Sequence, residues 1–381
     1  MATTSALVSK SDFEHLEGVV HLAAGGETPP LKSQRDALLR FYDDKGRAPG
    51  LGGTPASLKA DTYRRAKEYA AALFALPADD VAFASSAAEA MSQVALSLPL
   101  GAGDNIVVED MEFASAILPW VRLQDRGVEL RLVKHLDFNA EETAFASAID
   151  ARTRAIVTSQ VGYLTGVQHN MERLRALADG VGALLVNDAT HAAGAVRVPG
   201  DLCDFSVAAC YKWLLGCTGI AILAWNRDRV PEVRPAIVGW RTVSGLDRPD
   251  ATNLTPKPTA ERLEPGNPPW PSVFYLEEGL RYLTEVGIDR IEPYVMSLSD
   301  RMNAGLRRLG LPVSTPADRA SRAGNNCFWW EKPEDLTRRL AERRILVSGY
   351  SGRIRISTHL NDDVSDVDAC LNALDELTRH P

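Results

Sequence analysis

Short, continuously apolar runs recur between residues 81 and 225, and they constrain the fold more than any other feature of the chain. They lack the alternation of apolar and polar residues expected of a half-exposed strand, so each predicts a strand buried on both faces. Helix-like stretches such as 113–127 and 171–182 separate them. The runs are 81–85, 105–110, 129–135, 155–161, 183–188, 204–210 and 219–225. This alternation predicts an α/β, doubly wound domain with a mostly parallel sheet.

The chain changes character after the last of these runs. Residues 231–273 are rich in proline, glycine and tryptophan and predict a long surface connection. Helix-like and strand-like stretches then follow to the C-terminus, which predicts a smaller α+β domain. The expected divisions are an N-terminal segment (1–20), a large α/β domain (21–255) and a small C-terminal domain (256–381).

Composition argues against several classes of function. The net charge of −8 over 381 residues does not predict a nucleic-acid-binding surface. No apolar run is long enough to span a bilayer, and residues 1–18 lack the pattern of a signal peptide. The five cysteines show no CxxC spacing, so neither a disulfide framework nor a zinc site is predicted. We therefore expect a cytoplasmic protein without nucleic-acid, membrane or metal partners.

Two of the buried runs lead to residues that can carry chemistry. Asp188 ends the run 183–188, and Lys212 follows the run 204–210. Taken singly, Asp188 predicts a helix N-cap and Lys212 a surface side chain. Ligands of open α/β sheets bind at the carboxyl ends of the strands, so the pair can hold an organic cofactor from two sides. Pyridoxal 5′-phosphate (PLP) needs such a pair: a lysine for its aldehyde carbon and an acid for its ring nitrogen.

The start of the helix-like stretch 86–98 predicts a phosphate site. The first apolar run leads into Ser86 and Ala87, with Glu89 in the first helical turn. Backbone N–H groups at a helix N-terminus, with serine hydroxyls, can bind a phosphate without a basic residue. The same pattern is also a capping box, and the two interpretations are compatible. The chain has no GxGxxG after its first strand, no GxxxxGK[ST] and no GxSxG, which argues against dinucleotide, phosphoryl-transfer and hydrolase chemistry.

Several blocks of sequence resemble the class V aminotransferase-fold group of PLP enzymes, which have fold type I and include cysteine desulfurases and isopenicillin N epimerase-like proteins. The most specific blocks are VNDATHAAGAV and CYKWLLGCTGIAIL. Further matches, in the order of the group, are HLAAGGETPP, VAFASSAAEAM, EFASAILPW, SQVGYLTGV, ERLEPGNPPW and RIRISTHLNDDVSDVD. The resemblance covers nearly the whole chain and implies a PLP cofactor, a small amino-acid substrate and a homodimer with shared active sites.

The resemblance also implies catalytic roles. Lys212 forms the Schiff base with PLP and then acts as acid and base, and Asp188 contacts the pyridine nitrogen. His191, the second expected catalytic residue, lies near the O3′ oxygen of the cofactor. Phe113 stacks on the pyridine ring, where many relatives have histidine, and Arg355 holds the substrate carboxylate.

Further cofactor and substrate contacts follow from the same resemblance. Ser86, Ala87 and Tyr211 are expected at the phosphate. Either Gln160 or Tyr163 is expected to donate a hydrogen bond to O3′. The remaining expected contacts are Tyr350, in the substrate pocket, and Asn267, which replaces a threonine that reaches the phosphate of the neighbouring subunit.

The reaction is predicted from a residue that is missing. Cysteine desulfurases carry a nucleophilic cysteine shortly before the carboxylate-binding arginine, and residues 345–357 contain none. We therefore expect an aminotransferase or a Cα/Cβ-type lyase, and not a persulfide-forming desulfurase. An epimerase or a retro-aldol enzyme is the alternative on the same scaffold. A non-catalytic PLP-fold protein is the alternative from another class, although the set of Asp188, His191, Lys212 and Arg355 favours an enzyme.

Overall fold

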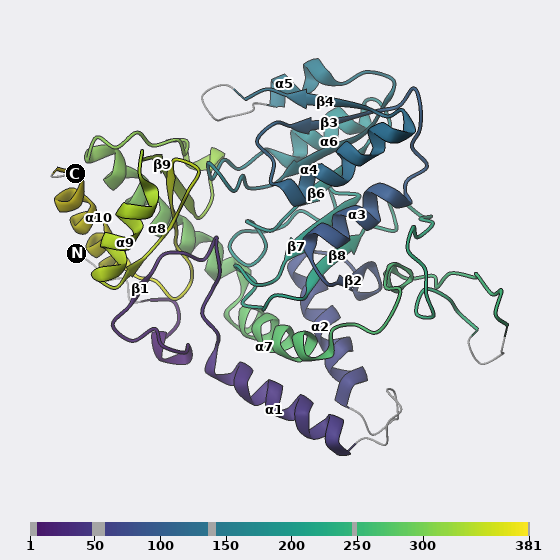
Figure 1. The fold of residues 1–381 in the computed structure, drawn as a ribbon, viewed down its shortest axis with the longest axis horizontal. Coiled ribbons are helices and arrows are strands. Elements are labelled where there is room, and N and C mark those ends of the chain that lie inside the picture. The colour runs from purple at the N-terminus through teal and green to yellow at the C-terminus, as the bar shows by residue number, and fades with distance from the viewer. Residues whose placement is uncertain (1–5, 48–57, 136–141, 246–249, 380–381) are drawn as a thin grey trace.

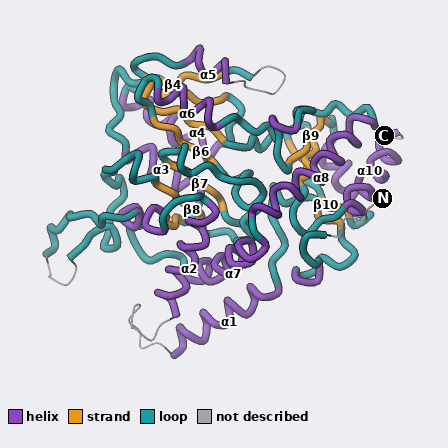
Figure 2. Tube along the Cα trace, turned by 180° about the vertical axis from the view of Figure 1, so that it is seen from behind, coloured by secondary structure: helices purple, strands orange, loops and turns teal. Residues whose placement is uncertain are grey.

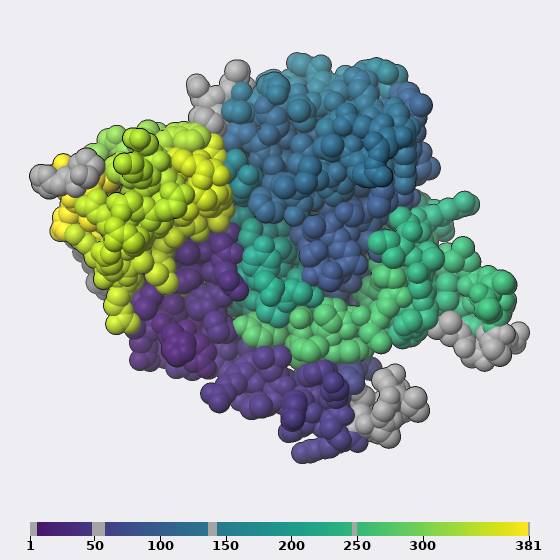
Figure 3. All heavy atoms as spheres, in the orientation of Figure 1, coloured from purple at the N-terminus to yellow at the C-terminus, as the bar shows by residue number. Residues whose placement is uncertain are grey.

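The chain forms two lobes that lie side by side (Figure 1). The computed structural model describes residues 6–47, 58–135, 142–245 and 250–379, so part of the predicted N-terminal segment, residues 1–5, lies outside the described residues. The large lobe is built on a seven-stranded sheet and the small lobe on a three-stranded sheet. Figure 3 shows the C-terminal residues gathered beside the large lobe. The predicted boundaries at residues 20 and 255 stay predictions.

The large sheet has the strand order β2-β8-β7-β6-β5-β3-β4. β8 is antiparallel to both of its neighbours, and the other neighbouring strands pair in parallel. Its strands are β2 (Val81–Ala84), β3 (Asn105–Glu109), β4 (Glu129–Val133), β5 (Thr153–Ser159), β6 (Leu184–Asp188), β7 (Phe205–Ala209) and β8 (Ala221–Trp225). Each predicted apolar run forms one of these strands, and the predicted mostly parallel α/β fold is confirmed.

Helices cover both faces of this sheet. Successive strand residues point to opposite faces, so Val108 of β3 packs in one apolar cluster with Trp120, while Val107 packs in another with Phe145. This two-sided burial explains why the strands read as continuous apolar runs. The helices that cover the sheet are α3 (Ala87–Ser97), α4 (Ala114–Val121), α5 (Glu142–Ala148) and α6 (Met171–Asp179).

A third group of helices packs beside the large sheet. Helix α7 lies against both α1 and α2, and Phe74, Leu276 and Trp213 share their apolar cluster. These helices are α1 (Lys32–Arg47), α2 (Leu58–Leu73) and α7 (Trp270–Val286). Neither α1 nor α2 was predicted from the sequence.

The small lobe combines an antiparallel sheet with helices, as predicted. Its sheet has the order β11-β12-β9, and α8, α9 and α10 supply apolar residues to its core. The elements are α8 (Ile288–Arg308), β9 (Asn325–Trp329), α9 (Pro333–Glu342), β10 (Ile345–Leu346), β11 (Ser348–Tyr350), β12 (Arg353–Ser357) and α10 (Val364–Arg379).

The N-terminal segment links the two lobes. Strand β1 (Val20–His21) pairs in parallel with β10 of the small lobe, and the described part of the chain begins and ends at this lobe (Figure 2). A few residues later the Thr28 hydroxyl donates a hydrogen bond to the carbonyl of Lys212 in the large lobe. Within the described ranges, no helix has the length and apolar character needed to cross a membrane.

Candidate active site

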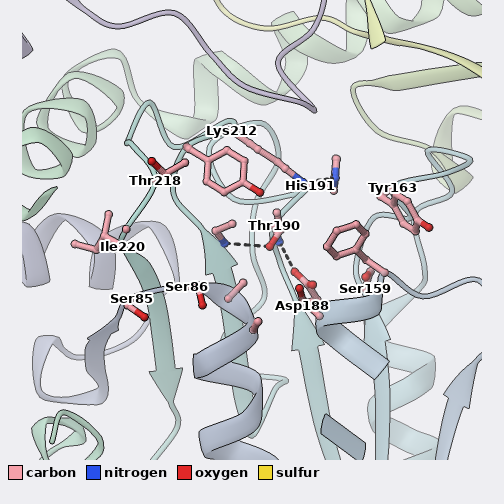
Figure 4. Close-up of a pocket in the computed structure, with 17 residues that line it drawn as sticks. Ser85, Ser86, Ser159, Tyr163, Asp188, Thr190, His191, Lys212, Thr218 and Ile220 are labelled. Atoms are coloured by element: carbon pink, nitrogen blue, oxygen red, sulfur yellow. Dashed lines mark hydrogen bonds between the residues drawn. The ribbon is translucent and has the colours of Figure 1, made fainter. Parts of the chain in front are cut away.

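A cavity of about 220 Å³ opens at the carboxyl ends of β5, β6 and β7 (Figure 4). It has room for several water molecules, each of which takes about 30 Å³ in the liquid. The side chains that line it come from segments far apart in the sequence and include eight hydroxyl groups. They are Ser85, Ser86, Ala87, Ala88, Phe113, Ser115, Ser159, Tyr163, Asp188, Thr190, His191, Ala209, Tyr211, Lys212, Thr218, Gly219 and Ile220.

Lys212 enters the cavity from the turn after β7. Its side chain is 8% exposed, and its Nζ lies 3.1 Å from Nε2 of His191. Burial, followed by the positive charge of Arg355, lowers the pKa of Lys212 to about 8, although Asp188 opposes this effect. The amine is therefore much closer to its neutral, nucleophilic form near pH 7 than an exposed lysine is.

Close backbone contacts fix the turn that presents Lys212. Leu215 has a positive φ of 54°, and Thr28 holds the Lys212 carbonyl from the N-terminal segment. Gly194 has a φ of +92°, and a Cβ at this position would clash with the carbonyl of Trp213. Only glycine satisfies both conditions without strain, so Gly194 allows the turn to lie against its neighbour.

Asp188 ends β6, in register with Ser159 of β5. Its carboxylate is buried and accepts a hydrogen bond from the Thr190 N–H at 2.9 Å. Burial raises the pKa of Asp188, whereas the bonds from Thr190 and the charge of Lys212 lower it. Among the described residues no side chain forms an ion pair with this carboxylate. A buried acid in this state suits a protonated ring nitrogen.

His191 is buried between the two lobes. Its Nε2 faces Lys212, and its Nδ1 lies 2.9 Å from the amide nitrogen of Asn325. Burial, then the charges of Lys212 and Arg355, lowers the pKa of His191 well below its usual value. The ring is therefore neutral near pH 7.

The N-terminus of α3 forms another wall of the cavity. Ser86 is the N-cap residue, and its Oγ accepts a hydrogen bond from the Glu89 N–H at 3.2 Å. The Glu89 carboxylate accepts from the Ser85 N–H at 2.8 Å, one residue earlier than in a regular capping box. Among the described residues, Lys212 is the only lysine or arginine that lines the cavity. Backbone N–H groups of α3 therefore suit a phosphate here, and the contacts expected of Ser86 and Ala87 stay predictions.

Aromatic rings form the wall that faces the small lobe. Phe113 is 42% exposed, and its ring centroid lies 5.7 Å from the Nζ of Lys212. It packs edge to face on Tyr163, with ring centroids 5.1 Å apart. Tyr163 in turn lies parallel to Tyr350, with an interplanar angle of 7°. Phe113 thus presents a ring to the cavity, which suits its predicted stacking role.

Arg355 lies on β12 behind these aromatic rings. Its Nη1 donates hydrogen bonds to the hydroxyl of Tyr350 at 2.6 Å and to the carbonyl of Tyr163 at 3.1 Å. Its buried Nε has no hydrogen-bond partner within the described part of the chain, and a Cβ on Gly25 would lie 3.0 Å from that atom. An unpaired buried donor costs about 1–3 kcal/mol, so the Nε suits an incoming carboxylate.

Two predicted cofactor contacts lie away from the cavity. The Nε2 of Gln160 donates to the carbonyl of Arg197 at 2.7 Å, whereas Tyr163, its alternative, lines the cavity. Asn267 is exposed on the loop before α7. Both assignments stay predictions, and Asn267 depends on a second subunit.

Several polar residues of the site were not predicted from the sequence. Ser159 and Thr190 lie at strand ends beside Asp188, and the strand-end position that identified Asp188 applies to them as well. Glu112 is buried beneath the cavity, with its Oε2 2.5 Å from the Ser159 hydroxyl. Burial, then the charge of Glu109, raises the pKa of Glu112 to about 8. No pattern in the sequence distinguishes Glu112 from an exposed loop glutamate.

Comparison with known protein families identifies the family to which the chain belongs. The sequence profile of the aminotransferase class-V family matches residues 35–369. The chain belongs to this family. It is therefore a PLP-dependent enzyme of the class V fold, as the resemblance predicted, and its cofactor is PLP.

Relatives and solved structures agree on the fold. A probable cysteine desulfurase of Pyrococcus abyssi is 27% identical over 344 residues, covering 85% of this chain and 85% of the relative. A cysteine desulfurase of Yersinia pestis is 29% identical over 314 residues, covering 79% of this chain and 76% of the relative. The apo structure of a cysteine desulfurase from Thermococcus onnurineus superimposes with a TM-score of 0.87 at 24% identity, and all of both chains is covered.

These relatives correct the predicted function. From the sequence we expected an aminotransferase or a lyase and excluded a persulfide-forming desulfurase, because residues 345–357, around Arg355, contain no cysteine. That exclusion is wrong, since curated relatives that match over most of this chain are named cysteine desulfurases. The missing cysteine shows only that the loop before Arg355 carries no thiol. It does not show which bond of the substrate the bound cofactor helps to break.

The residues of the cavity fit PLP. The cofactor needs an amine for its aldehyde, an acid for its ring nitrogen and hydrogen-bond donors for its phosphate. Lys212, Asp188 and the N-terminus of α3 provide these groups around one cavity. The buried Asp188, which forms no ion pair with the described side chains, is the observation that most favours the fit.

Proposed function

We propose that this chain is a PLP-dependent cysteine desulfurase, which releases L-alanine from L-cysteine and transfers the sulfur to an acceptor thiol. In this reaction the Cβ–S bond breaks, a Cβ–H bond forms, and the acceptor thiol becomes a persulfide. The names of the relatives support the substrate. The single structural observation that supports the chemistry is the amine of Lys212, buried in the cavity within hydrogen-bonding distance of His191.

We assign the roles of the chain's own residues from their positions around this cavity. When bound, PLP supplies an electron sink that allows bonds at the Cα and Cβ of an amino acid to break. The Nζ of Lys212 holds the cofactor and then moves the Cα proton, which its lowered pKa favours. Asp188 keeps the ring nitrogen protonated and Phe113 packs on the ring. The phosphate contacts are assigned to Ser86, Ala87 and Tyr211.

Arg355 is the proposed site for the substrate carboxylate. Tyr350 and Tyr163 hold its Nη1, which leaves the Nε edge for the ligand. A planar guanidinium held from one side presents a rigid pair of donors to a carboxylate. The charge of Arg355 also lowers the pKa of Lys212, so the carboxylate site and the amine influence each other.

The chain offers one partly exposed thiol near the cavity. Cys203, Cys210, Cys327 and Cys370 are buried, whereas Cys217 is not. Cys217 directly precedes Thr218, which lines the cavity. We therefore propose Cys217 as the acceptor to test first within this chain, with a thiol from solution as the alternative.

A homodimer is the proposed assembly. Helix α1 exposes Leu39 and Tyr42, the latter 75% exposed, and the loop before α7 exposes Val238 and Trp240. Exposed apolar side chains such as these favour contact with a second subunit. The exposed Asn267 would then reach the partner's phosphate site, as the family resemblance implies. All five cysteines are free, which supports a reducing, cytoplasmic compartment.

The reaction is tested by incubating the PLP-loaded protein with L-cysteine and dithiothreitol. We expect L-alanine and sulfide in equal amounts, and no product from Lys212→Ala. Lys134→Ala is the matched control, because this lysine is 73% exposed and lies outside the cavity. Release of pyruvate and ammonia in place of alanine would contradict the proposal.

The acceptor is tested separately by mass spectrometry after a single turnover without dithiothreitol. A mass increase of one sulfur atom on the peptide that contains Cys217 identifies this thiol. The Cys217→Ser variant should then lose the added mass but still form alanine when dithiothreitol is present. If Cys217→Ser behaves like the wild type in both assays, the acceptor is a thiol from solution.

A further inference from the structure

A chain of hydrogen bonds runs from the small lobe to Lys212. Asn325 is the first residue of β9 and is fully buried. Its Oδ1 lies 2.7 Å from the hydroxyl of Ser357 on β12, and its Nδ2 lies 2.9 Å from Nδ1 of His191. On the other side of the ring, Nε2 lies 3.1 Å from the Nζ of Lys212.

The orientation of the Asn325 amide decides where the proton of His191 lies. With Oδ1 engaged by Ser357, the amide presents an N–H donor to the ring. The nitrogen that accepts this bond is unprotonated, so a neutral imidazole carries its proton on the other nitrogen. The Nε2–H then donates toward Lys212, whose Nζ can accept a hydrogen bond only as a neutral amine.

We propose that Asn325 is a positioning residue that favours the neutral form of Lys212 by fixing the proton of His191 on Nε2. The inference deepens the proposed function, because it rests on Lys212 being the amine that binds the cofactor. It adds a role for the small lobe: β9 supplies the donor that prepares a nucleophile on the large lobe before any ligand arrives.

On balance, the charges around His191 and Lys212 favour the neutral form of both groups. Arg355 on β12 lowers the pKa of both His191 and Lys212, whereas Asp188 on β6 raises that of Lys212. Burial is the largest cause for both groups, and it also favours their neutral forms. Burial and Arg355 therefore favour the neutral amine that accepts the hydrogen bond from His191, and they disfavour a buried ammonium.

The chain offers a matched control on the same strand. Asn326 is also fully buried, but it lies on the opposite face of β9. Its Nδ2 donates to the hydroxyl of Ser299 at 3.0 Å, and its Oδ1 accepts from Asn303 at 3.1 Å. Asn326→Asp therefore introduces the same isosteric change and the same buried charge without touching His191.

The experiment measures the ionisation of Lys212 directly in the full-length protein before PLP is added. Competitive acetylation with acetic anhydride, followed by peptide mass spectrometry, gives the labelling midpoint of Lys212 as a function of pH. In Asn325→Asp the carboxylate can only accept, so the His191 proton moves to Nδ1 and Nε2 now stabilises an ammonium. We expect the midpoint to rise by about one pH unit, or about tenfold slower labelling at pH 7.

Ser357→Ala separates the effect of the His191 proton position from the effect of the charge that Asn325→Asp adds. This variant adds no charge, but it releases Oδ1 and allows the Asn325 amide to turn over. We expect a smaller upward shift of the Lys212 midpoint, and no shift in Asn326→Asp. The inference is overturned if Ser357→Ala leaves the midpoint unchanged, or if Asn325→Asp and Asn326→Asp shift it equally. If Asn325→Asp does not fold, the labelling midpoint of Lys212 in Ser357→Ala alone tests the inference.

The labelling also separates this inference from the proposed reaction. Acetylation reports on Lys212 without substrate or cofactor. Failure to form alanine, with the expected midpoints, would overturn the desulfurase reaction and leave the role of Asn325 intact. Alanine formation with unchanged midpoints would overturn the role of Asn325 alone.

Discussion

Replacing Glu112 by glutamine should stabilise the protein, and more so as the pH rises. Both carboxylate oxygens of Glu112 contact Ser159, through its N–H and its hydroxyl. An amide of the same shape can accept from the N–H and donate to the hydroxyl. The substitution therefore keeps both contacts and removes only the ability to ionise beside Glu109 and Asp188, whose charges raise the pKa of Glu112.

The magnitude follows from the pKa of Glu112, which burial raises to about 8. Between the unfolded pKa near 4.5 and the folded value, the native state holds a proton that the unfolded state releases. Stability is therefore lost as the pH rises through this window. At pH 7 the cost is about 3 kcal/mol, taking about 1.4 kcal/mol for each pH unit above the unfolded pKa.

Urea denaturation at several pH values tests this reasoning. The difference in unfolding free energy between Glu112→Gln and the wild type should be small near pH 4.5, grow with pH, and level off above pH 8. Glu376→Gln, at a side chain that is 67% exposed, is the control and should show no such trend. A difference for Glu112→Gln that stays constant with pH would refute the argument.

Three further substitutions test other parts of the structure. Gly194→Ala should lower the unfolding free energy by about 3 kcal/mol or more, measured by urea denaturation, since the new Cβ meets the Trp213 carbonyl at a positive φ. Tyr350→Phe removes the hydrogen bond to Arg355 and should raise the KM about fivefold with little change in kcat. The reason is that a hydrogen bond to a charged group contributes about 1 kcal/mol or more. An unchanged KM would show that Tyr350 is not part of the substrate site. Tyr42→Glu places a charge on the exposed face of α1 and should shift the protein toward a monomer in light scattering, whereas an unchanged mass would place the subunit contact elsewhere.

The large sheet could be predicted from the sequence because its strands, apart from β4 at the edge, are buried on both faces. Continuous apolar runs therefore indicate strands that helices cover on both faces. They also locate the strand ends near which Asp188 and Lys212 lie. Helix α1 was missed for the opposite reason. Its Leu39 and Tyr42 are exposed, so its sequence lacks the apolar stripe that marks a helix packed within its own subunit.

Residues of the site could be predicted only where a chemically reactive side chain lies at a recognisable position, the end of a buried strand. Lys212 and Asp188 have side chains unusual for buried strand ends, whereas Glu112 and Asn325 look like ordinary loop and strand residues in the sequence. Their roles depend on which distant residue they meet: Ser159 for Glu112, and His191 for Asn325. Such contacts between remote segments follow from the tertiary fold, which no local pattern specifies.

The pairing of β1 with β10 has a consequence for how the enzyme folds. Val20 pairs with Ile345, which lies 325 residues later in the sequence. Contacts between residues this distant in sequence form slowly, because a long loop must close before they contribute to stability. The segment that holds the Lys212 carbonyl through Thr28 therefore reaches its final place only after the residues of β10 have been synthesised. The nascent enzyme is thereby expected to remain unable to secure its cofactor lysine until β10 is available to pair with β1.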